Sequence, residues 1–117
     1  RNIDFLTIHV MLNEETRNLI NEDSIKFLKK NCIVVNTARS EIIDQKSVIN
    51  ALNKNLISGY LCDVFNTEPL RPNDTIINAK NVIITPHIGS RTYENVVRQG
   101  IYAIENLIKS INEYKQN

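Results

Sequence analysis

The sequence lacks the features that would direct it to a membrane or a polyanion. No apolar stretch approaches the roughly 20 residues that span a bilayer, and no charged-then-apolar leader opens the chain. Lys and Arg number 14 against 13 Asp and Glu, and this net charge of +1 creates no field for nucleic acid or membrane binding. We therefore expect a soluble, cytoplasmic protein that binds neither.

Cysteine and glycine are also scarce. Cys32 and Cys62 are the two cysteines, and both lie in apolar runs, which is typical of buried thiols in a reducing compartment rather than of a disulfide framework. Neither His9 nor His87 belongs to a cluster with metal-ligand spacing, so we expect no metal site. The chain begins without methionine and at once enters the run DFLTIHV, which predicts a buried strand and a piece of a longer protein.

Short β-branched runs alternate with helical stretches along the 117 residues, of which 42% are hydrophobic. This alternation predicts an α/β fold, in which helices flank a parallel sheet. The expected strands are 5–10, 33–35, 60–64 and 82–85. The first expected helix is capped by Asn21 or Asp23 and has an apolar face of Ile25, Phe27 and Leu28. The second begins at Asp44, ends near Lys54 and turns Val48, Ile49, Ala51 and Leu52 inward. The third is a long C-terminal helix over 92–115 that begins at Ser90 or Thr92.

Three residues with useful chemistry follow these runs, namely Arg39, Glu68 and His87. The carboxyl ends of parallel strands are where an open α/β sheet binds its ligand. A guanidinium holds a carboxylate or phosphate through paired donors, and an imidazole exchanges a proton near neutral pH. A carboxylate beside that imidazole fixes its tautomer and favours its charged form. The three residue types indicate a site that binds an anion and moves one proton.

Each of these residues also has an ordinary structural explanation. Arg39 could be an ordinary surface arginine in a turn, and His87 could be a strand-end histidine that bonds backbone groups. Glu68 could be a solvated loop residue. Asp63, after an apolar run, either bonds a ligand or backbone group or forms a turn. His9 is more typical of a structural histidine. The loop 66–80 is longer than packing requires, and is either functional or a mobile connection.

Four segments together carry a family resemblance: IHVMLNEETRNLI, NTARSEIIDQKSVINAL, SGYLCDVFNTEP and NVIITPHIGSRTYENV. They resemble the D-isomer-specific 2-hydroxyacid dehydrogenases, most closely the phosphoglycerate dehydrogenase branch. The resemblance implies a Rossmann-like NAD-binding sheet. It also implies an NAD-dependent oxidoreductase that transfers a hydride between nicotinamide and a D-2-hydroxy or 2-oxo acid, with 3-phosphoglycerate as one candidate, and it leaves NADP open.

The resemblance also assigns roles to single residues. It implies that Arg39 anchors the substrate carboxylate, that His87 is the acid/base and that Glu68 is its acidic partner. Glutamate at position 68 argues against the formate dehydrogenase relatives, which carry glutamine in that role. The residues implied to contact the cofactor are His9, Val10, Thr37, Ala38, Arg39, Asp63, His87, Gly89 and Ser90.

The sequence departs from the family pattern in several places. Met11 and Ser40 stand where the family often has proline and glycine, and neither the glycine-rich turn G-x-G-x-x-G nor a separate substrate domain occurs in the 117 residues. We therefore expect residues 1–117 to be the C-terminal half of an NAD-binding domain, inactive alone and part of a homodimer at full length. The alternatives are a hydroxypyruvate or glyoxylate reductase and an NADH-sensing protein similar to the C-terminal-binding protein corepressors.

Overall fold

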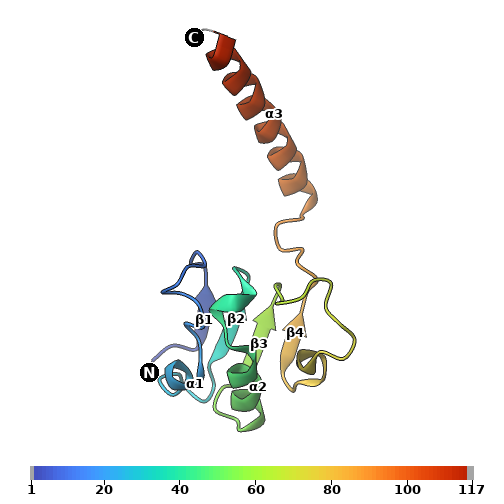
Figure 1. Cartoon of the computed structure of the whole chain (residues 1–117). Helices are drawn as coiled ribbons and strands as arrows, with labels where there is room; N and C mark the ends of the chain where they lie inside the picture. The colour runs from blue at the N-terminus through green and yellow to red at the C-terminus, as the bar shows by residue number, and fades with distance from the viewer. Residues whose placement is uncertain (1, 116–117) are drawn as a thin grey trace. The chain divides into compact units, whose positions relative to one another are not determined.

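A computed structural model describes residues 2–115, which divide after His87 into two compact units. The first unit is a four-stranded sheet with short helices, and the second is one long helix (Figure 1). The elements are, in chain order, β1 (Phe5–Ile8), α1 (Glu22–Ile25), β2 (Ile33–Asn36), the 3-10 helix η1 (Ser40–Ile42), α2 (Gln45–Asn53), β3 (Gly59–Cys62), the 3-10 helix η2 (Thr75–Asn78), β4 (Val82–Ile84) and α3 (Tyr93–Lys115).

The four strands are all parallel and lie in the order β1-β2-β3-β4. One row of the register joins Ile8, Asn36, Cys62 and Ile84, the last residue of each strand. The parallel α/β fold predicted from the sequence is confirmed. Three of the strands end earlier than predicted. Because the last residues of all four strands lie in one row, the segments that follow them all leave the sheet from that row.

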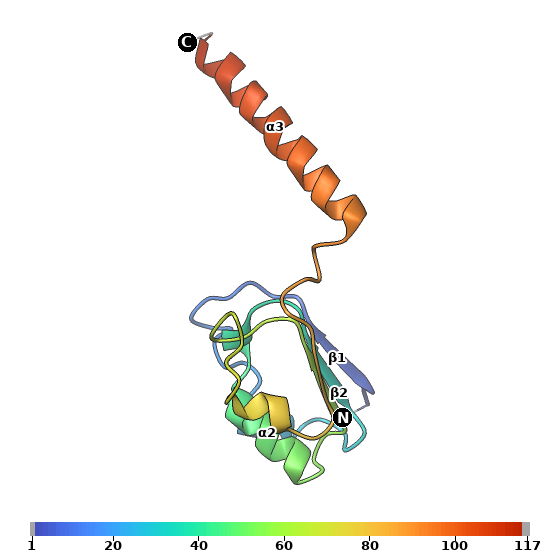
Figure 2. The ribbon, with the colours of Figure 1, turned by 90° about the vertical axis from the view of Figure 1, so that its right-hand side faces the viewer.

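The core lies on one face of the sheet. Figure 2 shows α2 and η2 on the same side of the strands, and the residues buried between these layers include Val34, Tyr60, Val48, Leu52 and Ile76. The prediction of a buried first strand is wrong for Phe5, whose surface is 66% exposed. Successive side chains of a strand point to opposite faces, and in the described residues of the first unit Phe5 faces away from the core.

The helix caps form largely as predicted, but the first helix is shorter. Asn21 caps α1 in a capping box with Ser24, and Asp44 caps α2. Because α1 ends at Ile25, the predicted inward position of Phe27 is wrong, and that ring is 65% exposed. The predicted inward face of α2 is confirmed by burial of three of its residues, Val48, Ala51 and Leu52.

Helix α3 forms most of the second unit, which begins at Ile88. Thr92 caps it, because its Oγ1 accepts a hydrogen bond from the Asn95 N–H at 3.3 Å. No residue of α3 is buried in the structure. Among the residues the structure describes, no helix has both the length and the apolar composition that a membrane span requires.

Both cysteines are buried and without a disulfide, as predicted. Burial raises the pKa of the Cys62 thiol to about 11, and burial likewise raises the pKa of Cys32. The two thiols are therefore small apolar side chains of the folded first unit rather than reactive groups.

Candidate functional site

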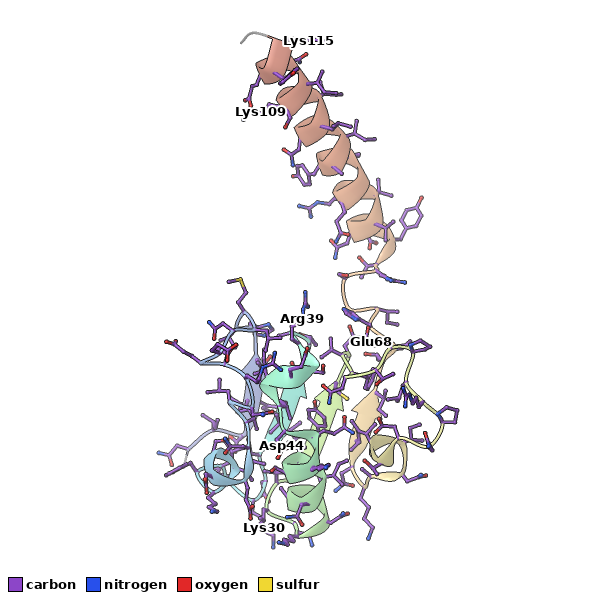
Figure 3. The ribbon with its side chains drawn as sticks, in the orientation of Figure 1. Lys30, Arg39, Asp44, Glu68, Lys109 and Lys115 are labelled. Carbon is purple, nitrogen blue, oxygen red and sulfur yellow. The ribbon has the colours of Figure 1, made fainter. Side chains whose placement is uncertain are left out.

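The three residues that the sequence singled out meet at the carboxyl edge of the sheet. Arg39 follows β2, Glu68 lies in the loop after β3, and His87 follows β4. Figure 3 shows Arg39 and Glu68 at the edge of the sheet opposite to Lys30. All three side chains line one hollow of about 270 Å³, together with residues of η1 and of the segment 64–66. The parallel topology thus brings these residues to a common place.

Glu68 and His87 form a hydrogen-bonded pair in this hollow. The Nδ1 of His87 lies 2.7 Å from Oε2 of Glu68, and the other carboxylate oxygen, Oε1, accepts the Phe65 N–H at 3.0 Å. With both oxygens of Glu68 engaged, the carboxylate is fixed and Nδ1 carries the proton. The Nε2 of His87 has no partner among the described residues. It is therefore the ring nitrogen available to exchange a proton with a ligand.

The backbone of His87 is held in an uncommon conformation. Its φ is 54°, in the left-handed region that most residues other than glycine avoid, although histidine tolerates it better than most. Its N–H donates to the Thr85 carbonyl at 3.0 Å across Pro86, which forms a tight three-residue turn. A conformation of this kind costs about 1–3 kcal/mol and persists where surrounding contacts determine it. The turn thereby fixes the start of the imidazole side chain.

Asp63, directly after β3, is hydrogen-bonded to Thr85, directly after β4. The carboxylate is 5% exposed, and its Oδ1 accepts a hydrogen bond from the Thr85 hydroxyl. Its backbone N–H donates to the Asn36 carbonyl at 3.1 Å. The structure therefore supplies the donor that a buried carboxylate requires. Contact of Asp63 with a cofactor stays a prediction.

The pairing of Glu68 with His87 can be tested by measuring the pKa of Glu68 with NMR. The hydrogen bond from His87 and, next, that from the Phe65 N–H hold the pKa of Glu68 below its ordinary value of 4.5. Because the folded pKa is lower than the unfolded one, the pair stabilises the fold above about pH 4.5 and this stabilisation is lost as pH falls through the folded pKa. We expect His87→Ala to raise the pKa of Glu68, measured by carboxyl-carbon titration.

Asp23 provides an internal control in the same spectra. Its pKa is lowered by its exposed neighbour Lys26, at 2.7 Å on α1, so His87→Ala should leave it unchanged. An unaltered Glu68 titration in the variant would contradict the described pairing.

A second hollow, of about 410 Å³, opens at the ends of β1 and β2. Five of the residues predicted to contact the cofactor line it, namely His9, Val10, Thr37, Ala38 and Arg39. The imidazole of His9 is held locally, with Nε2 2.7 Å from the Thr7 hydroxyl. Arg39 lines both hollows. Its Nη1 donates to the Ala38 carbonyl at 2.7 Å, which leaves its other N–H donors for a ligand.

The other predicted cofactor contacts outside the paired residues are Asp63, Gly89 and Ser90. Gly89 and Ser90 belong to the second unit, and Asp63 lines neither of the two hollows. A larger hollow, of about 620 Å³, is lined by parts of the loop 66–80 and of α2, and no predicted site residue reaches it. The sequence reasoning missed Asn36, whose signal was a polar residue at the end of the β-branched run that precedes Arg39.

Comparison with known proteins identifies the family. The family described as D-isomer specific 2-hydroxyacid dehydrogenase, NAD binding domain, matches residues 1–89. The chain belongs to this family. A glyoxylate reductase of Aeropyrum pernix is 43% identical over 108 residues, which cover 92% of this chain and 32% of that protein. The glyoxylate/hydroxypyruvate reductase B of Cronobacter sakazakii is 34% identical over 109 residues, covering 93% of this chain and 34% of that protein.

Solved structures of dehydrogenases and related proteins share the fold. The TT0316 protein of Thermus thermophilus matches with a TM-score of 0.86 and 33% identity, covering 94% of this chain and 35% of that one. These likenesses confirm the predicted family and its Rossmann-like sheet. The chain spans about a third of the length of the curated 2-hydroxyacid dehydrogenase relatives it matches.

The two hollows fit the cofactor that the family description names. In an open α/β sheet, dinucleotides bind in the crevice outside the carboxyl ends of the strands, and the hollow bordered by His9 and Thr37 lies at those ends. It adjoins, through Arg39, the hollow that holds the Glu68–His87 pair. The residues present therefore suit a nicotinamide ring placed next to an acid/base.

Proposed function

We propose that the full-length protein is an NAD(P)-dependent D-2-hydroxyacid dehydrogenase that reduces a small 2-oxo acid. The observation that carries this proposal is that Arg39, Glu68 and His87 line one hollow, which adjoins a second hollow suited to the cofactor. The relatives named glyoxylate reductase favour glyoxylate over 3-phosphohydroxypyruvate as the substrate. In this proposal the chain supplies the C-terminal half of the NAD-binding domain.

The side chains divide the chemistry between them. NADH or NADPH supplies the hydride when bound. The Arg39 guanidinium binds the substrate carboxylate through paired N–H donors and so orients the 2-oxo group. His87 gives the proton on Nε2 to the oxygen at C2 as the carbonyl becomes a hydroxyl, and takes it back in the oxidation. Glu68 accepts the Nδ1–H of His87 and stabilises the charged imidazolium before the transfer.

The residues proposed to hold the cofactor follow from the second hollow. His9, Val10, Thr37 and Ala38 border it and would lie against the nicotinamide ring. On the resemblance to the family, the proposed set also includes Arg39 and His87, beside their catalytic roles, and it is completed by Asp63, Gly89 and Ser90. We also propose a homodimer at full length, which sedimentation equilibrium of that protein tests directly.

A substrate panel tests the proposed activity. The full-length protein is incubated with NADH or NADPH and with glyoxylate, hydroxypyruvate or 3-phosphohydroxypyruvate, and consumption of the reduced cofactor is followed. We expect the highest kcat/KM with glyoxylate or hydroxypyruvate. Failure to turn over any 2-oxo acid with either cofactor would contradict the proposal. NADH-responsive partner capture by an inactive protein would point instead to a corepressor-like function.

A further inference from the structure

A buried amide closes strand β2 directly before the turn that carries Arg39. Asn36 is 0% exposed, and its side chain makes two hydrogen bonds to that turn. Its Nδ2 donates to the Arg39 carbonyl at 2.9 Å, and its Oδ1 accepts the Ala38 N–H at 3.1 Å. One amide thus binds the chain on both sides of the peptide unit between Ala38 and Arg39. This arrangement fixes which end of the amide is oxygen, because the reverse would oppose two oxygens and two N–H groups.

The amide is itself held from the neighbouring strand. Asn36 pairs with Cys62 in the register of β2 and β3, and its carbonyl accepts the Asp63 N–H at 3.1 Å. A buried polar group is costly unless it is paired. The two side-chain bonds and this backbone bond pair Asn36, so its position is fixed.

Besides Asn36, the Ile42 N–H holds this turn, because it donates to the Arg39 carbonyl at 3.3 Å as η1 begins. Arg39 is exposed and has extended backbone, with φ −141° and ψ 142°. Its guanidinium donates to the Ala38 carbonyl, within the turn itself, at 2.7 Å. The direction in which the guanidinium leaves the sheet edge, between the two hollows, therefore depends on the path of residues 37–39. Asn36 bonds both Ala38 and Arg39, at shorter distances than the Ile42 bond, which reaches Arg39 alone.

We propose that Asn36 is a positioning residue for Arg39: it fixes the turn so that the guanidinium meets the substrate carboxylate. The kinetic part of this inference rests on the proposed function. A group that holds a substrate-binding side chain within a fraction of an ångström matters because a misplacement of about 1 Å costs up to about 100-fold in rate. A buried asparagine with a merely structural role would instead affect stability alone.

The chain offers a matched control in Asn21. Its Oδ1 accepts the Asp23 and Ser24 N–H groups at 2.9 and 3.1 Å, and its Nδ2 donates to the Asn18 carbonyl at 2.9 Å. The bonds are of the same kind as those of Asn36, but Asn21 lines neither of the two candidate hollows. Asn21→Ala should lower the melting temperature of the full-length protein and leave the KM for the 2-oxo acid unchanged.

The first measurement is a double-mutant cycle in the full-length protein. We expect Asn36→Ala to lower kcat/KM for the best 2-oxo acid of the panel by about 10- to 100-fold, mainly through KM. In an Arg39→Ala background the same change should alter kcat/KM by less than about twofold, because the side chain that Asn36 positions is gone. An equal loss in both backgrounds overturns the proposal. Asn36→Ser, which keeps a hydroxyl acceptor for the Ala38 N–H, serves if the alanine variant does not fold.

The second measurement does not need activity. Removal of the Asn36 amide deprives the Ala38 N–H of its acceptor, and we expect its hydrogen exchange in the full-length protein to rise by about fivefold or more. An unchanged exchange rate overturns the positioning role. If the wild-type protein reduces no 2-oxo acid, the proposed function fails, while this exchange measurement still decides whether Asn36 holds the turn.

Discussion

Replacement of His87 by asparagine in the full-length protein is expected to lower kcat by about 10²- to 10⁴-fold, the usual contribution of a general acid/base. Asparagine has a polar side chain that still reaches Glu68, but its amide does not exchange a proton near neutral pH. Water must then donate the proton to the oxygen at C2. Since His87 is one of nine residues proposed to contact the cofactor, and the other eight are kept, NADH affinity is expected to stay within about threefold of the wild-type value.

Two measurements check this expectation. Steady-state turnover of the best 2-oxo acid gives kcat, and fluorescence titration of NADH gives the dissociation constant. A second variant, Glu68→Gln, keeps one oxygen to accept the Nδ1–H of His87, but it removes the negative charge and the second oxygen, which accepts the Phe65 N–H. We expect its loss in kcat to be smaller than that of His87→Asn. Near-normal turnover of the asparagine variant would refute the role of His87.

Replacement of Arg39 by lysine is expected to raise the KM for the 2-oxo acid by about 10- to 150-fold, which corresponds to a hydrogen bond to a charged group worth about 1.5–3 kcal/mol. Lysine keeps the charge but loses the planar fork that binds both carboxylate oxygens. It also loses the Nη1 contact with the Ala38 carbonyl, so the side chain is less restrained. The variant therefore tests the geometry of the Arg39 guanidinium while the positive charge at position 39 is kept.

The matched control is the same exchange at Arg17, an exposed arginine that lines neither candidate hollow. Arg17→Lys should leave KM and kcat at their wild-type values. Initial rates over a range of 2-oxo acid concentrations, at saturating NADH, measure both constants. If KM is unchanged in the Arg39 variant, Arg39 does not anchor the substrate.

Local signals in the sequence were sufficient for the order and type of the elements. Asp44 and Asn21 each precede a helix and cap it, because a side-chain oxygen within two or three residues of the first free N–H groups acts over a short range. The alternation of runs predicted the parallel sheet for a similar reason. Phe5 and Phe27 were predicted to be buried and are exposed. The reason is that the apolar character of a residue does not show which face of its strand or helix another element covers.

The sequence by itself determined which side chains follow the strands, and so that a guanidinium, a carboxylate and an imidazole stand at strand ends. The tertiary structure alone decided that these groups share one hollow. In it, Nδ1 of His87 lies 2.7 Å from Oε2 of Glu68, although the two residues are 19 positions apart in the sequence. It also decided that Asn36, to which the sequence analysis gave no role, is fully buried against the turn of Arg39. The physical reason is that contacts through space depend on the alignment of parallel strands at one edge, whereas caps and strand patterns depend only on near neighbours in the chain.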